Sequence, residues 1–210
     1  RSPRHRAAAR DLQNGRTFEA TRTLRALLDE DPDDAAAAIW LGIHASRTGD
    51  HATADRLLAH AAALVPGEPG AQLALAEHLV RSKRFAPALA ALDALPDRDR
   101  ADASAERLRA TCLGELGRVE EQLAAYHRLS TASPDPGRYA LPIALAQRAL
   151  GQLDKSERGL RAVLARAPGD GLAWYHLANL KRGRFDDKDV RRMEEALAAE
   201  PSPDRLIPLH

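Results

Sequence analysis

The chain has 210 residues and a net charge of +1, from 31 Lys and Arg against 30 Asp and Glu. This balance excludes the strongly basic surface of a general nucleic-acid binder, and no apolar run is long enough to span a membrane. Ala is abundant, with 43 residues, whereas Val and Ile number 5 and 4 and aromatic residues make up 4%. A β-sheet favours the scarce types, so the composition predicts an all-α fold.

Three sets of residues recur along the chain with a period of 34. Prolines stand at Pro32, Pro66, Pro134 and Pro168, with Pro201 following 33 residues later. Small residues recur at Ala8, Gly42, Ala76, Ala110, Ala144 and Ala178. A third set holds Gly15, Gly49, Lys83, Gly117 and Gly151. Such self-similarity at a fixed period indicates a repeat protein.

Each recurring residue has a structural role in a helix–turn–helix unit. We expect the small residue where the two helices of a unit cross closely, and the glycine in a left-handed turn between them. The proline ends the second helix because it cannot continue the hydrogen-bond ladder. In the third unit Lys83 replaces the glycine, and Pro96 ends the second helix early. The predicted units are 1–34, 35–68, 69–102, 103–136, 137–170 and 171–201, with 202–210 as the start of a truncated further helix.

Three stretches resemble the tetratricopeptide repeat (TPR) family. Residues 174–178 (WYHLA) match the start of its first helix, residues 15–20 (GRTFEA) match the turn into the second, and Asp31 with Pro32 matches the end. The resemblance implies a single α-solenoid over 1–210, a right-handed superhelix of about six units with a concave face.

The sequence contains no recognisable catalytic motif. It has no phosphate-binding glycine loop, and no two of its eight histidines are four residues apart, so none form a helical metal-binding pair. Cys112 is the only cysteine and is interpreted as a core residue. We therefore expect no cofactor, no metal and no catalytic residue, and one unpaired cysteine favours a cytoplasmic location.

In TPR solenoids the first helix of each unit lines the groove that binds partners. Applied here, the resemblance gives candidate groove residues at helical spacing: Ile39, Ile43, Arg47, Leu73, Glu77, Arg81, Arg107, Arg138, Leu141, Leu145, Arg148, Tyr175, Asn179 and Arg182. Arginine forks bind carboxylates, so the expected partner is a protein or peptide with acidic groups, and neither nucleic acid nor a membrane. The alternative is that these arginines only solvate the surface or pair with local acids.

The segment 178–187 (ANLKRGRFDD), with Asp189, Met193 and residues 202–205, resembles the late repeats of bacterial TPR-containing sulfotransferases. That resemblance implies a longer parent protein with a PAPS-dependent catalytic domain beyond residue 210. The excess of Arg over Lys, 27 to 4, favours a bacterial source. Three hypotheses follow: a non-catalytic binding scaffold, a substrate-positioning region of a sulfotransferase, and a solenoid that associates end to end with itself.

Overall fold

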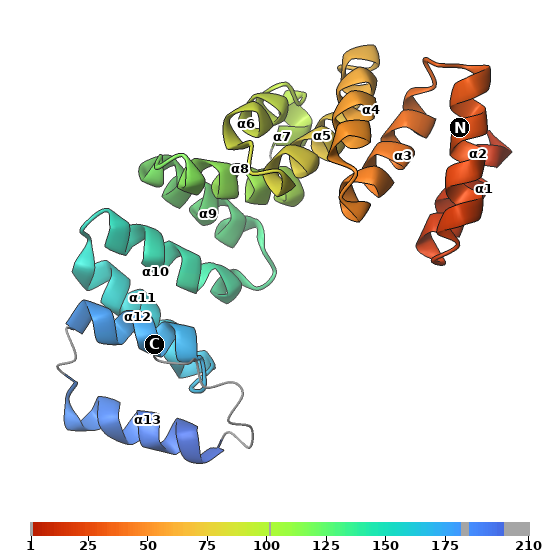
Figure 1. The fold of residues 1–210 in the computed structure, drawn as a ribbon. Helices are drawn as coiled ribbons and strands as arrows, with labels where there is room; N and C mark the ends of the chain where they lie inside the picture. Colours follow the sequence, from red (N-terminus) through yellow and green to blue (C-terminus); the bar gives the residue numbers. More distant parts are fainter. Residues whose placement is uncertain (1, 101, 182–184, 200–210) are drawn as a thin grey trace. The chain divides into compact units, whose positions relative to one another are not determined.

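The computed structural model describes residues 2–100, 102–181 and 185–199, and within these ranges every regular element is helical (Figure 1). The chain divides into two compact units, Arg1–Leu116 and Gly117–His210. Each is described by itself. A single right-handed superhelix over 1–210 stays a prediction, and the segment 202–210 lies outside the described residues.

The first unit contains three pairs of helices, each joined by a short turn, and one further first helix. The bounds are α1 Pro3–Gln13, α2 Thr17–Glu30, α3 Ala35–Thr48, α4 His51–Leu64, α5 Pro69–Arg81, α6 Phe85–Asp93, α7 Asp97–Arg100 and α8 Ala103–Glu115. The early end of α6, three residues before Pro96, confirms the irregular third repeat. The short α7 is an addition that the 34-residue period does not predict.

The second unit begins with a second helix and continues the pattern. Its elements are α9 Val119–Ala132, the 3-10 helix η1 Pro136–Tyr139, α10 Ala140–Ala149, α11 Leu153–Arg166, α12 Gly171–Lys181 and α13 Asp187–Ala199. Helices α4, α9 and α11 end two residues before Pro66, Pro134 and Pro168. The periodic proline therefore marks the end of the second helix, as predicted.

The periodic small residues lie where the two helices of a repeat cross. A Cβ on Gly42 of α3 would lie 2.7 Å from Leu58 Cγ of α4. In the other unit, a Cβ on Gly159 of α11 would lie 2.9 Å from Ala144 Cβ of α10. Such distances leave no room for larger side chains, so the small residue sets how closely the two helices approach.

Lys83 departs from the period at a position where the backbone favours glycine. The glycines at the equivalent turns have φ between 72° and 84°, and Lys83 adopts the same left-handed conformation with φ of 57°. A side chain in that conformation is strained because its Cβ crowds the backbone. The turn between α5 and α6 is therefore formed at a cost that the other turns do not have.

Lys83→Gly is expected to stabilise the chain by about 1 kcal/mol, since it removes this strain. Urea unfolding monitored by circular dichroism measures the change. Lys155→Gly, in the first turn of helix α11, is the matched control and is expected to destabilise, because glycine is a poor helix former. A Lys83→Gly variant no more stable than wild type would show that the turn is unstrained.

Buried histidines link successive repeats of the first unit. His78 of α5 is 1% exposed; its Nε2 donates to Asp55 Oδ1 of α4 at 3.2 Å, and its Nδ1 is hydrogen-bonded to the Ser46 hydroxyl of α3 at 2.9 Å. Arg84 donates to the same Asp55 oxygen at 2.6 Å. Ser46 is itself buried, so this Ser–His–Asp set holds helices together and is closed to a substrate.

A second histidine makes the same kind of link nearer the start of the chain. His5 Nε2 of α1 lies 2.7 Å from Asp34 Oδ2, and Asp34 also accepts the Ala37 amide hydrogen at the start of α3. The acidic turn before α3 thus caps a helix, as its sequence predicted.

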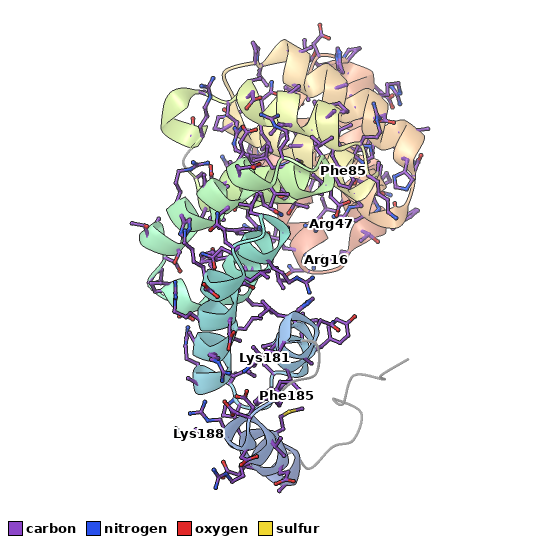
Figure 2. The ribbon with its side chains drawn as sticks, turned by 90° about the vertical axis from the view of Figure 1, so that its left-hand side faces the viewer. Arg16, Arg47, Phe85, Lys181, Phe185 and Lys188 are labelled. Carbon is purple, nitrogen blue, oxygen red and sulfur yellow. The ribbon has the colours of Figure 1, made fainter. Side chains whose placement is uncertain are left out.

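In the second unit a buried carboxylate connects α13 to its neighbours. Asp189 is fully buried and accepts two hydrogen bonds from Arg161 of α11, at 2.6 and 3.0 Å. Lys181 of α12 lies 3.5 Å from the same carboxylate, and Phe185 packs edge-on against Trp174. Figure 2 labels Lys181 and Phe185 where α12 leads toward α13. The carboxylate therefore joins three helices.

Candidate functional site

The predicted groove residues of the first unit occupy equivalent places in successive repeats. Helices α3, α5 and α8 pack side by side, and residues 34 apart fall at the same level of each helix. We call the set Ile39, Ile43, Arg47, Leu73, Glu77, Arg81 and Arg107 the first-helix strip. Arg47 and Arg81 form one level of this strip, each in the last turn of its helix.

The first-helix strip combines half-buried aliphatic residues with exposed charges. Ile39 and Ile43 pack against the cluster formed by Ala45, Leu58 and their neighbours, and Leu73 packs against the next cluster. These three side chains are partly used in packing, and only part of each faces solvent. The strip thus offers a shallow apolar floor beside exposed Arg47, Glu77, Arg81 and Arg107.

The arginines of the first-helix strip have no acidic partner in the described part of the chain. Many other arginines do: Arg4 pairs with Glu30, Arg84 with Asp55 and Arg166 with Asp135, for example. Arg47, Arg81 and Arg107 make no such ion pair with a described residue. Of the two alternatives to a groove, pairing with local acids therefore has no ion pair to support it here.

The remaining candidates lie in the second unit, on η1, α10 and α12. The Arg138 guanidinium lies 5.3 Å from the centroid of the Tyr139 ring. Leu141 packs against the local core, and Leu145 and Arg148 are half-buried. Tyr175 is 44% exposed and Asn179 is exposed. Arg182 lies outside the described residues.

The structure adds His176 to this second set. Its Nδ1 is buried and lacks a hydrogen-bond partner among the described residues. Burial, helped by the nearby positive charge of Arg148, lowers the pKa of His176. The ring also packs edge-on against Tyr175, with centroids 5.2 Å apart. The sequence carried no signal for this residue, because its importance depends on α10 and α12 meeting.

Other functional chemistry is limited in the described ranges. They contain no group of three or more His, Cys, Asp and Glu side chains suited to a metal ion. No helix in them has the length and apolarity needed to cross a membrane. Cys112 is fully buried in a hydrophobic cluster, and burial raises the pKa of its thiol, so the reactive thiolate is disfavoured. Its interpretation as a core residue is confirmed.

Family comparison agrees with the repeat architecture. Two models of the tetratricopeptide repeat match the chain, one over residues 5–69 and the other over 45–112. The chain therefore contains tetratricopeptide repeats, as the period and the motifs indicated.

Individual relatives extend this comparison. The chain is 27% identical over 190 residues to cellulose synthase 1 operon protein C of Komagataeibacter xylinus, matching 89% of this chain but only 12% of that protein's length. Among solved structures, PilW, a type IV pilus biogenesis factor, has a TM-score of 0.75 at 17% identity and covers 97% of this chain and 94% of its own. YrrB, described as a TPR protein with an unusual peptide-binding site, has a TM-score of 0.66 at 16% identity, covering 87% and 95%. The two structural likenesses concern the fold.

Proposed function

We propose that the chain is a non-catalytic TPR scaffold that binds a protein or peptide segment containing acidic groups on the first-helix strip. One observation carries this proposal: Arg47 and Arg81 stand at the same level of adjacent helices, exposed and without an acidic partner in the described ranges, beside a half-buried aliphatic floor. The peptide-binding site named for YrrB supports a peptide as the class of partner.

The chemistry of the strip favours a carboxylate next to an aliphatic or aromatic side chain. Each guanidinium can donate two parallel hydrogen bonds to a carboxylate, and a charge-assisted hydrogen bond contributes about 1.5–3 kcal/mol. The apolar part of the partner would cover Ile39, Ile43 and Leu73. In the second unit, Tyr175 and Asn179 beside Arg148 offer a similar combination.

The other two hypotheses have less support. The cellulose synthase operon relative is a far longer protein, and its likeness favours a scaffold role within a larger bacterial protein. The sulfotransferase hypothesis depends on a segment that includes residues 182–184 and 202–205, outside the described ranges. End-to-end self-association stays a prediction, and sedimentation at two protein concentrations would reveal it.

Arg47→Gln with Arg81→Gln is expected to weaken acidic-peptide binding about tenfold or more, because two charge-assisted contacts are lost. A phage library of random linear peptides, selected on the wild-type chain, supplies the probes, and fluorescence anisotropy of synthesised peptides measures affinity. The affinity of the variant should also depend less on salt, since fewer charges remain to be screened.

The matched control removes two exposed arginines of second helices, Arg22→Gln with Arg158→Gln, and so changes net charge equally. It should leave affinity nearly unchanged. If every selected peptide binds the Arg47 and Arg81 variant as tightly as wild type, the first-helix strip is not the binding surface.

A further inference from the structure

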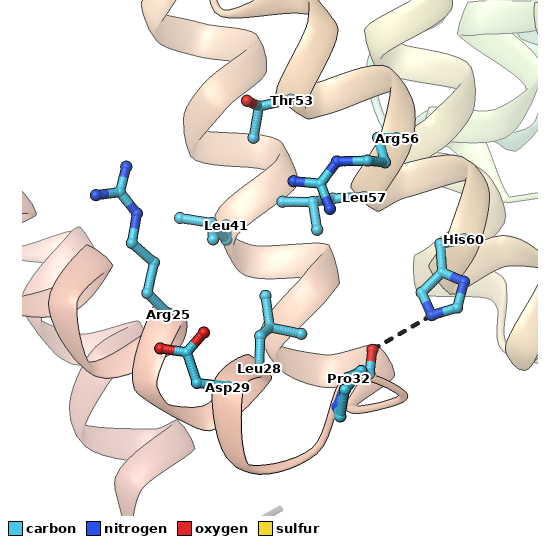
Figure 3. Close-up of a pocket in the computed structure, with 9 residues that line it drawn as sticks. All are labelled: Arg25, Leu28, Asp29, Pro32, Leu41, Thr53, Arg56, Leu57 and His60. Atoms are coloured by element: carbon cyan, nitrogen blue, oxygen red, sulfur yellow. Dashed lines mark hydrogen bonds between the residues drawn. The ribbon is translucent and has the colours of Figure 1, made fainter.

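A cavity of about 610 Å³ lies on another side of the first unit, between the second helices α2 and α4 (Figure 3). Its volume falls within the range of ligand pockets, roughly 300–1,000 Å³. Leu28 of α2, Leu41 of α3 and Leu57 of α4 form its apolar floor. The cavity therefore draws one apolar side chain from each of three helices.

This cavity is separate from the first-helix strip. On α3, Leu41 is two residues from both Ile39 and Ile43, which places it about 200° around the helix axis from each of them. The strip and the cavity therefore use opposite sides of the same helix. A ligand in the cavity would not touch the strip, so variants can disable the two surfaces separately.

The rim of the cavity carries arginines that have no acidic partner. Arg25 of α2 and Arg56 of α4 line it and make no ion pair with a residue in the described ranges. Figure 3 shows them on either side of the leucine floor. Arg25 is close enough to Asp50 to help lower the pKa of that carboxyl group, yet no hydrogen bond joins them.

The other polar groups at the rim leave an excess of positive charge. Asp29 supplies the one carboxylate among the lining residues, against two guanidinium groups. His60 is held by the loop before α3: its Nε2 lies 3.3 Å from the Pro32 carbonyl oxygen and 3.2 Å from Asp33 Oδ1. The rim thus keeps two free cationic hydrogen-bond donors above an apolar floor.

We propose that the cavity between α2 and α4 is a second binding site for an acidic peptide segment, one that inserts a large apolar side chain onto Leu28, Leu41 and Leu57. A carboxylate next to that side chain is bound by Arg25 or Arg56. An apolar residue alone would leave both guanidinium groups unused, and a purely acidic segment would leave the leucine floor uncovered. Apolar and acidic groups side by side satisfy both parts of the cavity.

The test uses the full chain with the strip disabled by Arg47→Gln and Arg81→Gln. A phage library of random linear peptides is selected on this variant, and the enriched peptides are synthesised. They should carry Asp or Glu beside Phe, Tyr, Leu or Met, and they should shift the methyl NMR signals of Leu28, Leu41 and Leu57. Adding Arg25→Gln and Arg56→Gln should lower their affinity about tenfold or more.

Arg22→Gln with Arg158→Gln again serves as the control of equal charge, and it should change affinity little. Arg25 and Arg56 make no internal ion pair with a described residue, so the variant should keep the helical content of wild type. Peptides without acidic enrichment, or an affinity that ignores Arg25 and Arg56, would overturn the proposal.

Two further outcomes separate this proposal from the function proposed above. If wild type selects acidic peptides and the strip-disabled chain selects none, the strip is functional and the cavity proposal is wrong. If methyl signals of the leucine floor shift with protein concentration alone, a second copy of the chain fills the cavity, which also overturns the proposal.

Discussion

Ala144→Trp is expected to destabilise the second unit by about 3 kcal/mol, the upper end of the usual effect of overpacking. Ala144 is fully buried, and its Cβ lies 2.9 Å from where a Cβ on Gly159 would stand. At the same crossing, the Ser156 hydroxyl donates to the Ala144 carbonyl oxygen at 2.7 Å. An indole ring would push α10 and α11 apart and break this buried hydrogen bond.

Urea unfolding monitored by circular dichroism measures the loss. Ala149→Trp is the control, because Ala149 lies on the same helix and is exposed. It should change the free energy of unfolding by less than about 0.5 kcal/mol. Equal stability of the Ala144→Trp variant and wild type would show that the two helices can separate at no cost, and that the small residue does not set their spacing.

Asp189→Ala is expected to cost about 3 kcal/mol, because breaking a buried ion pair leaves the remaining charges uncompensated. Arg161 would lose both of its hydrogen bonds to the carboxylate, and Lys181 would lose a neighbouring charge. Hydrogen exchange of the α13 amides reports the effect where it occurs. Asp187→Ala, at an exposed position of the same first turn, should have a much smaller effect, and equal effects would mean that the buried carboxylate contributes nothing specific.

Acid should release α13 for the same reason. Hydrogen bonds from Arg161, together with its positive charge, lower the pKa of Asp189 below its ordinary value. The stabilisation is therefore complete above the pKa of an unfolded aspartate, about 3.9, and is lost as the pH falls through the lower pKa of the folded state. Protection of the α13 amides should decline over that range in wild type. In Asp189→Asn it should be low at every pH, with little further change.

The helices were predictable because each boundary depends on a local property of one residue type. Proline ends a helix wherever it stands, and a left-handed turn favours glycine, so the 34-residue period places the boundaries of nearly every helix. Lys83 shows the limit of that reasoning in a useful way. The turn keeps the left-handed conformation even without glycine, so the repeat's packing determines the backbone there.

The binding surfaces were predictable only in part. The levels of the first-helix strip follow from helical spacing and the period, so Arg47 and Arg81 could be placed on adjacent helices. The cavity could not be found in this way, since Leu28, Leu41 and Leu57 belong to the cores of different helices and look like ordinary packing residues. Where three helices leave space depends on how far apart they pack, and sequence periodicity carries no such distance. His176 was missed for a similar reason.

The buried histidine of the first unit also limits how the repeat array can change in evolution. The positions 34 residues after Ser46, Asp55 and His78 hold Val80, Leu89 and Cys112, so this polar set occurs at one junction. Duplicating or deleting a single repeat there would bring a buried imidazole against aliphatic side chains with no hydrogen-bond partner. The repeats of this chain are alike in backbone but not interchangeable. Growth or shortening of the array is therefore expected at other junctions, and the order of the second and third repeats is fixed by their side chains.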